Sequence, residues 1–239
     1  MSVVCVIPAR YNSSRFPGKL LANALGKTVL QRTWESASLC SKIDGLYIAT
    51  DSEEIAEHAK KIGAEVLWTS STPRDGTERI TEALQKYPCL QGAELILNLQ
   101  GDAPGTPPET LQAIVDMLKQ DCDAVMSTAA SPLTDSEDLY LPRSVKCVRD
   151  MQGNALYFSR APIPYCQSGA AQTLMHVGIY CYRSAFLKIL ASLPPTPLQM
   201  QENLEQLKVL EWGYRIKVAL VAPNPPSVDT PEDLVELEE

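Results

Sequence analysis

The chain has 239 residues, of which 45% are hydrophobic and 21% charged, and its formal net charge is −8. These values are typical of a folded globular protein with one large domain, and they exclude a disordered or fibrous chain. Nucleic-acid binding is disfavoured because it needs many spread-out Lys and Arg side chains. A small anionic ligand, held by a few cations in one cleft, fits the acidic balance better.

The apolar runs are all shorter than the roughly 20 residues of a membrane-spanning helix, and the N-terminus carries no signal-peptide pattern. We therefore expect a cytoplasmic protein. The seven cysteines contain no C-x-x-C pair, and Cys5, Cys147 and Cys181 lie in apolar strand-like runs. A thiol in such a run acts as a small hydrophobe, so neither a disulfide framework nor a zinc site is predicted.

The first half of the chain alternates strand and helix patterns over short connections. Strands are predicted at 2–9, 46–51, 64–69 and 93–102, and helices at 28–41, 53–62 and 77–87. Repeated strand–helix–strand units of this length form a parallel sheet that helices cover on both faces. Ligands are then expected beyond the carboxyl ends of the strands.

The second half of the chain is less regular. Strands are predicted at 123–130, 144–150, 155–160, 176–183 and 215–221, and helices at 109–119 and 201–213. A last helix is opened by Asp229 or Thr230 as its N-cap, with Pro231 in its first turn. We interpret 131–200 as a smaller lobe within a single domain that spans 1–239.

A basic loop, IPARYNSSRFPGK (7–19), follows the first strand. Its cations Arg10, Arg15 and Lys19 supply donors, and Gly18 permits close approach of the backbone, so the loop predicts a phosphate-binding site. A basic surface loop paired with acidic helices is the alternative. The loop has neither G-x-x-x-x-G-K-[ST] nor G-x-G-x-x-G, which disfavours P-loop hydrolases and dinucleotide dehydrogenases.

Two carboxylates are candidate magnesium ligands. Asp102 follows the most apolar strand, where a lone carboxylate is costly unless it is solvated, paired or bound to a cation. Asp229 faces the same cleft if the last helix packs beside the fourth strand. Mg²⁺ is typically held by one or two carboxylates together with substrate phosphates. The alternatives are a turn cap after Gly101 for Asp102 and a helix N-cap for Asp229.

Three further features are weaker. RDGTERI (74–80) combines a glycine, a hydroxyl and a helix start, which suits reading a base or phosphate through backbone groups, but a plain helix start looks the same. His176 opens an apolar strand, where an isolated histidine is usually structural. His58 lies among charges in a helix and is expected to be solvated.

Eight segments in order resemble the 3-deoxy-manno-octulosonate cytidylyltransferase family, the CMP-Kdo synthetases. They are IPARYNSSRFPGKLL, ATDSEEI, DGTER, NLQGDAP, ALYFSRAPIP, HVGIYCYR, LEQLKVLEWG and SVDTPEDL, and they extend over nearly the entire chain. The segments from ALYFSR onward separate this family from other sugar nucleotidyltransferases that share the first loop.

The resemblance implies a Rossmann-like α/β nucleotidyltransferase with a mostly parallel central sheet and a smaller α+β lobe. The implied reaction transfers CMP from CTP to the anomeric hydroxyl of Kdo, with release of pyrophosphate, for lipopolysaccharide biosynthesis. The implied cofactor is Mg²⁺. The implied assembly is a homodimer, with the smaller lobe serving sugar binding and dimerisation.

The resemblance also assigns residues by motif. The nucleotide-binding set is Arg10, Arg15, Lys19, Gly76, Thr77, Arg79 and Gln100. The sugar-binding set is Arg160, His176, Tyr180, Glu205 and Gln206. Asp102 and Asp229 are the implied metal ligands, and with Arg15 and Lys19 they form the implied catalytic set.

Two departures from the family pattern leave alternatives open. Ala103 stands where the family often has Glu, and the stretch between Pro164 and His176 is shorter than in typical members. A modified acid sugar such as 8-amino-Kdo is therefore an alternative acceptor. A sialic acid acceptor is disfavoured by LEQLK and HVGIY. A non-catalytic CTP-binding paralogue is disfavoured because both carboxylates and all three loop cations are present.

Overall fold

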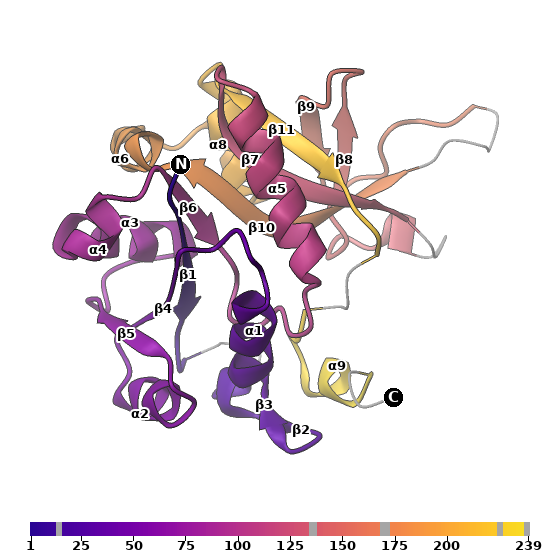
Figure 1. Cartoon of the computed structure of the whole chain (residues 1–239). Coiled ribbons are helices and arrows are strands. Elements are labelled where there is room, and N and C mark those ends of the chain that lie inside the picture. Colours follow the sequence, from indigo (N-terminus) through magenta and orange to yellow (C-terminus); the bar gives the residue numbers. More distant parts are fainter. Residues whose placement is uncertain (13–15, 134–137, 168–172, 224–226, 237–239) are drawn as a thin grey trace.

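The computed structural model is built around one large sheet (Figure 1). The structure describes residues 1–12, 16–133, 138–167, 173–223 and 227–236. The main path of this sheet is formed by β1 (Val3–Ala9), β4 (Gly45–Thr50), β5 (Glu65–Trp68), β6 (Leu95–Asn98), β7 (Ala124–Pro132), β10 (Leu174–Arg183) and β11 (Arg215–Leu220).

The spatial order of these strands is β11-β7-β10-β6-β1-β4-β5. β10 is antiparallel to both of its neighbours, β6 and β7. The pairs β11–β7, β6–β1, β1–β4 and β4–β5 are parallel. The predicted α/β fold with a mostly parallel central sheet is therefore confirmed.

β1 lies between β6 and β4, and every one of its seven residues is buried. Its side chains alternate between the faces of the sheet: Cys5 and Ile7 join one apolar cluster, and Val4 and Val6 join the other. Such two-sided burial explains why the strand reads as a continuous apolar run rather than as an alternating pattern.

Helices cover both faces of the sheet (Figure 1). They are α1 (Val29–Ser38), α2 (Glu53–Lys61), α3 (Gly76–Lys86), α4 (Pro88–Gln91), α5 (Pro108–Gln120), α6 (Ser184–Ser192), α7 (Pro197–Glu202), α8 (Glu205–Glu211) and α9 (Pro231–Glu236). α1, α2 and α5 pack into the cluster that holds Cys5, whereas α3, α6 and α8 pack into the cluster that holds Val4.

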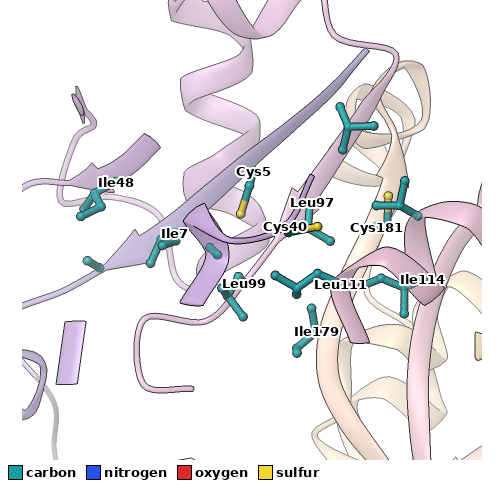
Figure 2. Packing of buried hydrophobic residues seen from close by; sticks show 14 of the residues in the cluster. Cys5, Ile7, Cys40, Ile48, Leu97, Leu99, Leu111, Ile114, Ile179 and Cys181 are labelled. Atoms are coloured by element: carbon teal, nitrogen blue, oxygen red, sulfur yellow. The ribbon is translucent and has the colours of Figure 1, made fainter. Parts of the chain in front are cut away.

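Figure 2 shows the first cluster, in which Leu97 and Cys181 from the sheet lie near Ile114 of α5. Fully burying a Leu or Ile side chain contributes about 1.5–3 kcal/mol, so this packing is a main source of stability. Cys5 and Cys181 are buried free thiols, as predicted, and burial raises the pKa of both. They act as small hydrophobes.

Side-chain caps set the starts of three helices. Thr28, Ser52 and Asp75 precede α1, α2 and α3, and each side chain accepts a hydrogen bond from the backbone N–H three residues later. Such a cap is worth about 1 kcal/mol. The position of Asp75 matters for function, because it fixes the start of α3 directly after the loop that follows β5.

The prediction of one helix over 201–213 is wrong. The chain forms α7 and α8 instead, separated by Asn203 in the left-handed conformation with φ 51°. Two carbonyls at this break, those of Glu202 and Asn203, accept hydrogen bonds from the Arg160 guanidinium at 2.7 and 3.2 Å. A distant arginine thus stabilises a break that local periodicity does not reveal.

Much of 131–200 belongs to the main body, because β10 is part of the large sheet and α6 packs against α3. Outside the main path, β8 (Lys146–Arg149) pairs with β10 and with β9 (Ala155–Ser159). The remaining short elements are η1 (Lys19–Leu21), η2 (Asp138–Tyr140), β2 (Asn23–Ala24) and β3 (Lys27–Thr28). Within the described part of the chain, no helix has the length and apolar character needed to cross a membrane.

Candidate functional site

A cleft of about 310 Å³ opens beyond the carboxyl ends of β1 and β6, where a parallel sheet is expected to bind its ligand. Its lining residues come from the ends of these strands, from η1 and from the start of α3. They are Pro8, Arg10, Asn12, Lys19, Leu20, Arg74, Asp75, Gly76, Gln100, Gly101 and Asp102.

Two glycines allow the segments that line this cleft to pack closely against β1. A Cβ on Gly101 would lie 3.2 Å from the backbone oxygen of Pro8, and a Cβ on Gly76 would lie 3.0 Å from Cγ of Pro8. A side chain at either position would push into the wall of the cleft. The glycines of DGTER and QGD therefore let the start of α3 and the loop after β6 approach β1 closely.

Lys19 is the central charged group of the site. Its Nζ lies 2.5 Å from Oδ2 of Asp102 and 3.0 Å from Oδ1 of Asp229. Burial lowers the pKa of Lys19, but the two carboxylates outweigh this effect, so the net shift of the pKa is upward. The structure thus brings together three residues that lie far apart in the sequence.

The loop before α9 positions Asp229. The backbone N–H of Val228 donates to the carbonyl of Asp102 at 2.9 Å. The hydroxyl of Thr230 accepts from the N–H of Asp233 at 3.4 Å, and Oδ2 of Asp233 accepts from the N–H groups of Asp229 and Thr230 at 2.8 Å each. Because Thr230 and Asp233 cap the helix start, the side chain of Asp229 is directed to Lys19 instead.

The donor chemistry of Asp102 and Asp229 fits a divalent cation such as Mg²⁺. Both supply hard carboxylate oxygens, both are partly exposed at 24% and 37%, and the pair already holds the cationic ammonium of Lys19. In the part of the chain that the structure describes, no cluster of three or more His, Cys, Asp or Glu residues could enclose a metal ion. A cation held here would therefore take its other ligands from substrate or water.

The predicted basic loop is only partly described. Arg10 lines the cleft, and its Nη2 donates to the carbonyl of Pro73 at 2.7 Å. Arg15 lies outside the described residues. The sequence analysis missed Asn12, Arg74 and Asp75 as lining residues, although all three stand in segments that it singled out.

Gly76, Thr77 and Gln100 take different positions at the start of α3. Gly76 and Gln100 line the cleft, whereas Thr77 is buried beneath it. Nε2 of Gln100 donates to Oδ1 of Asn98 at 3.0 Å, and Nδ2 of Asn98 donates to the Thr77 hydroxyl at 3.4 Å. That hydroxyl lies 3.3 Å from the hydroxyl of Tyr182. The sequence analysis missed Asn98 and Tyr182, because a buried polar residue in an apolar strand carries no local signal of its partners.

Arg79 does not line the cleft. Its side chain is 1% exposed, with Nη2 3.0 Å from Oδ1 of Asp51 and Nη1 donating to the hydroxyl of Thr69 and to the carbonyl of Ser70. Burial lowers the pKa of its guanidinium. Arg79 therefore braces the loop after β5, whose Pro73 carbonyl in turn holds Arg10.

A second, mostly neutral group lies on β10 and α8. The hydroxyl of Tyr180 donates to Oε1 of Gln206 at 3.3 Å, and the His176 ring lies 5.6 Å from the Tyr180 ring. Burial lowers the pKa of His176 to about 3, so this imidazole is neutral. Nε2 of Gln206 is buried and has no hydrogen-bond partner among the described residues.

Glu205 joins this group to the cleft. Its carboxyl group is hydrogen-bonded to the hydroxyl of Thr77 and lies close enough to Asp75 to feel its charge. Burial, reinforced by Asp75, raises the pKa of Glu205 to about 8. The carboxyl group is therefore mostly protonated at neutral pH.

Within the described residues, the hydrogen bonds of the Arg160 guanidinium go to backbone carbonyls and not to the residues around Tyr180. That guanidinium donates to the carbonyls of Glu202, Pro142 and Asn203 at 2.7, 2.7 and 3.2 Å. The residue holds the α7–α8 break against the loop before β8. These contacts stabilise the local chain path, and the place of Arg160 in the sugar-binding set, which the family resemblance implies, stays a prediction.

Comparison with known proteins agrees with this architecture. The cytidylyltransferase family matches residues 4–216. The 3-deoxy-manno-octulosonate cytidylyltransferase of Protochlamydia amoebophila is 47% identical over 241 residues, which cover 99% of this chain and 93% of that protein. The mitochondrial 3-deoxy-manno-octulosonate cytidylyltransferase of Arabidopsis thaliana is 47% identical over 240 residues, which cover 99% and 82% of the two chains.

Solved structures give the same result. A CMP:2-keto-3-deoxy-manno-octonic acid synthetase complexed with CTP superposes with a TM-score of 0.94 at 33% identity, covering 100% of this chain and 97% of that one. A cytidylyltransferase of Leptospira borgpetersenii shares the fold with a TM-score of 0.66 at 18% identity, covering 100% and 85% of the two chains. The chain is therefore a cytidylyltransferase and belongs to the 3-deoxy-manno-octulosonate cytidylyltransferase family.

Proposed function

We propose that the protein transfers CMP from CTP to the anomeric hydroxyl of Kdo and releases pyrophosphate. Membership of the 3-deoxy-manno-octulosonate cytidylyltransferase family supports this reaction. The observation that carries the proposal in this chain is the meeting of Lys19, Asp102 and Asp229 at the rim of one cleft. This arrangement combines cationic donors for a triphosphate with oxygen ligands for a metal.

The cationic residues of the cleft bind the triphosphate and stabilise the leaving pyrophosphate. Arg10 is oriented by the Pro73 carbonyl, so its side chain need not be ordered during the reaction, and Lys19 lies at the same cleft beside its two carboxylates. Donors fixed in advance where charge develops lower the barrier of a phosphoryl-type transfer. The sugar hydroxyl attacks the α-phosphorus in line, and the protein contributes mainly position and electric field.

Asp102 and Asp229 would hold Mg²⁺. When bound, the ion would act as a Lewis acid on phosphate oxygen and lower the pKa of the attacking hydroxyl. The two carboxylates would hold the ion at the cleft and would compensate part of its charge. We assign no separate general base to the reaction.

The group around Tyr180 suits a sugar rich in hydroxyls. The unpaired Nε2 of Gln206 offers a buried donor, and a buried donor without a partner is costly until a ligand satisfies it. Neutral His176 and protonated Glu205 add hydrogen-bonding groups without adding charge. The contact between Glu205 and Thr77 places this group next to the start of α3 and hence next to the cleft.

We also propose a homodimer, a cytoplasmic location and a role in lipopolysaccharide biosynthesis, all of which the family resemblance implies. Exposed apolar side chains near β8, β9 and β11 support the dimer: Met151 and Leu220 line a groove of about 360 Å³, and Leu156 and Tyr165 are exposed as well. Contiguous exposed apolar surface marks interaction sites. Light scattering coupled to gel filtration should give twice the chain mass of 26.2 kDa.

A modified acid sugar such as 8-amino-Kdo is the second candidate acceptor. Ala103 supports it, because this side chain packs against the apolar core and gives the loop after Asp102 no second carboxylate. An acceptor that carries its own amino group would meet a different electrostatic environment here than in members with Glu. The Ala103→Glu variant tests whether this position sets the ratio of the two acceptors.

Pyrophosphate release with each of the four ribonucleoside triphosphates against a panel of acid sugars tests the proposal. Release with CTP and Kdo is the expected result. If kcat/KM is higher with 8-amino-Kdo than with Kdo, then 8-amino-Kdo is the acceptor, and the proposed transfer of CMP from CTP still holds. Binding of CTP without release with any acid sugar would instead indicate a non-catalytic nucleotide-binding protein.

A further inference from the structure

The ammonium of Lys19 contacts both of the carboxylates that would hold a divalent cation. Its Nζ lies within hydrogen-bond distance of both Asp102 and Asp229, and its side chain is only 11% exposed. We propose that Lys19 and the divalent cation compete for these carboxylates, so that the cation binds tightly only together with the nucleotide. This inference rests on the proposed function and specifies how metal binding at that site is controlled.

In the free protein, the Lys19 ammonium and a divalent metal ion would compete for the same two carboxylates, Asp102 and Asp229. The ammonium of Lys19 is within hydrogen-bond distance of one oxygen of Asp102 and one of Asp229, so a metal ion bound to the same two carboxylates would lie close to it. Two cations at such separations repel each other strongly in a partly buried site. Without either cation, two neighbouring carboxylates would repel each other, which explains why Lys19 is retained between them.

A nucleoside triphosphate changes this balance. Lys19 lines the cleft together with Arg10, so a triphosphate bound there offers its ammonium new anionic oxygen partners. Phosphate oxygens are also the ligands that complete the coordination of Mg²⁺ at sites with few protein carboxylates. If the Lys19 ammonium moved from the carboxylates to the phosphates, Asp102 and Asp229 would become available to the metal ion. The phosphate oxygens that complete its coordination would arrive with the same nucleotide.

The consequence is a thermodynamic coupling between metal and nucleotide. Bound nucleotide raises the affinity for the cation, and by linkage the bound cation raises the affinity for the nucleotide by the same factor. Lys19 supplies part of that coupling, because it blocks the cation in the free protein and stabilises the nucleotide in the complex. Removal of Lys19 should therefore strengthen metal binding to the free protein and weaken the coupling.

Titration with Mn²⁺, followed by the electron paramagnetic resonance signal of the free ion, tests this without any measurement of activity. The 239-residue protein and its Lys19→Met variant are titrated with and without CTP, in the absence of acceptor sugar. The Mn²⁺–CTP complex measured without protein is the reference. Without nucleotide, we expect the variant to bind Mn²⁺ about tenfold more tightly than the wild type. We expect CTP to raise the Mn²⁺ affinity of the variant by a smaller factor than that of the wild type.

Lys27→Met is the matched control, because it removes the same charge from an exposed lysine that pairs with Glu35 at 2.7 Å. A tighter Mn²⁺ site in this control would assign the effect to net charge and overturn the proposal, as would unchanged or weaker binding in Lys19→Met. Lys19→Gln serves as a second variant if Lys19→Met does not show the melting transition of the wild type.

The Asp102→Asn variant separates this proposal from the proposed function. Loss of Mn²⁺ binding in Asp102→Asn shows that the titration reports the site in question. Wild-type Mn²⁺ binding in that variant would overturn both the metal assignment and the competition. CMP transfer itself would then still be decided by the pyrophosphate assay on the wild-type protein.

Discussion

The two sides of the site differ in charge: one is an ionic cluster and the other is a group of neutral polar side chains. At the ends of β1 and β6, Lys19 and Asp102 form a partly exposed ionic cluster with Asp229. On β10 and α8, Tyr180 and Gln206 are buried, and the groups near them are kept neutral by burial. The difference suits two substrates: a polyanion with its metal needs fixed charges, whereas a sugar is recognised by hydrogen bonds in a site from which water is excluded.

The ionic side should be the more sensitive to a single change. Asp102→Asn removes one of the two carboxylates while keeping the size of the side chain, and Lys19 keeps Asp229 as its partner. We expect kcat for CMP transfer to fall by about 10³-fold, the upper range for loss of one electrostatic group in an active site, with little change in melting temperature. Asp123→Asn, at an exposed aspartate paired with Arg215, is the control and should retain full activity.

Turnover of Asp102→Asn within a few-fold of the wild type at ordinary Mg²⁺ concentration would contradict the metal assignment. A large drop in melting temperature would instead assign a structural role to the Lys19–Asp102 pair.

The neutral side should respond through substrate affinity. Gln206→Leu removes the acceptor of the Tyr180 hydroxyl and the buried donor that lacks a partner. We expect KM for Kdo to rise about tenfold, which corresponds to the loss of one buried hydrogen bond of about 1.4 kcal/mol, while KM for CTP stays constant. An equal rise in both KM values would show that Gln206 does not belong to a separate sugar side.

The protonated carboxyl group of Glu205 predicts a pH dependence of stability. Its pKa is raised to about 8 in the folded protein from an ordinary value of 4.5, so the folded state holds this proton where the unfolded state has released it. Stability should therefore fall as the pH rises from about 5 to 8, since the unfolded state binds fewer protons in that window.

Glu205→Gln should remove this part of the dependence. We expect its melting temperature to exceed that of the wild type at pH 8 by about 2–4 °C for each kcal/mol gained, and the difference to shrink towards pH 5. Melting curves at constant ionic strength measure it. The same pH slope in both proteins would show that Glu205 is ionised in the folded state.

The smallest effect is expected where the two sides meet. Thr77→Val keeps the shape of the side chain but removes the hydroxyl that contacts Asn98, Tyr182 and Glu205. We expect KM for both substrates to rise by about three- to tenfold, since a loss of about 1 kcal/mol in binding free energy corresponds to a change of about fivefold. Thr77→Ser restores the hydroxyl and should restore both values. A change in only one KM would place Thr77 on one side of the site rather than at its junction.

The chain itself revealed most of the local structure and the approximate place of the site. The apolar run of β1, the helix start with Thr230 before Pro231, and the polar residues after each strand are short-range patterns, which depend only on residues a few positions apart. The rule that ligands bind at the carboxyl ends of parallel strands then placed Asp102 at the cleft.

The partners of long side chains were decided only by the tertiary structure. Arg79 and Arg160 stand in segments with a strong family resemblance, yet their donors are taken up by Asp51 and by backbone carbonyls that come close only after folding. Asn203 breaks a helical pattern for the same reason, because the carbonyls at the break are satisfied by a distant arginine.

The same distinction holds for the charged centre. The sequence by itself determined that Lys19 lies in the loop after the first strand, that Asp102 ends the fourth predicted strand, and that Asp229 stands at the start of the last helix. Only the folded chain decided that Lys19 holds both carboxylates, because Thr230 and Asp233 cap α9 and leave Asp229 directed at the ammonium. Local patterns depend on neighbours a few residues away, whereas the contacts of a charge depend on which groups the whole fold brings within about 3 Å of it.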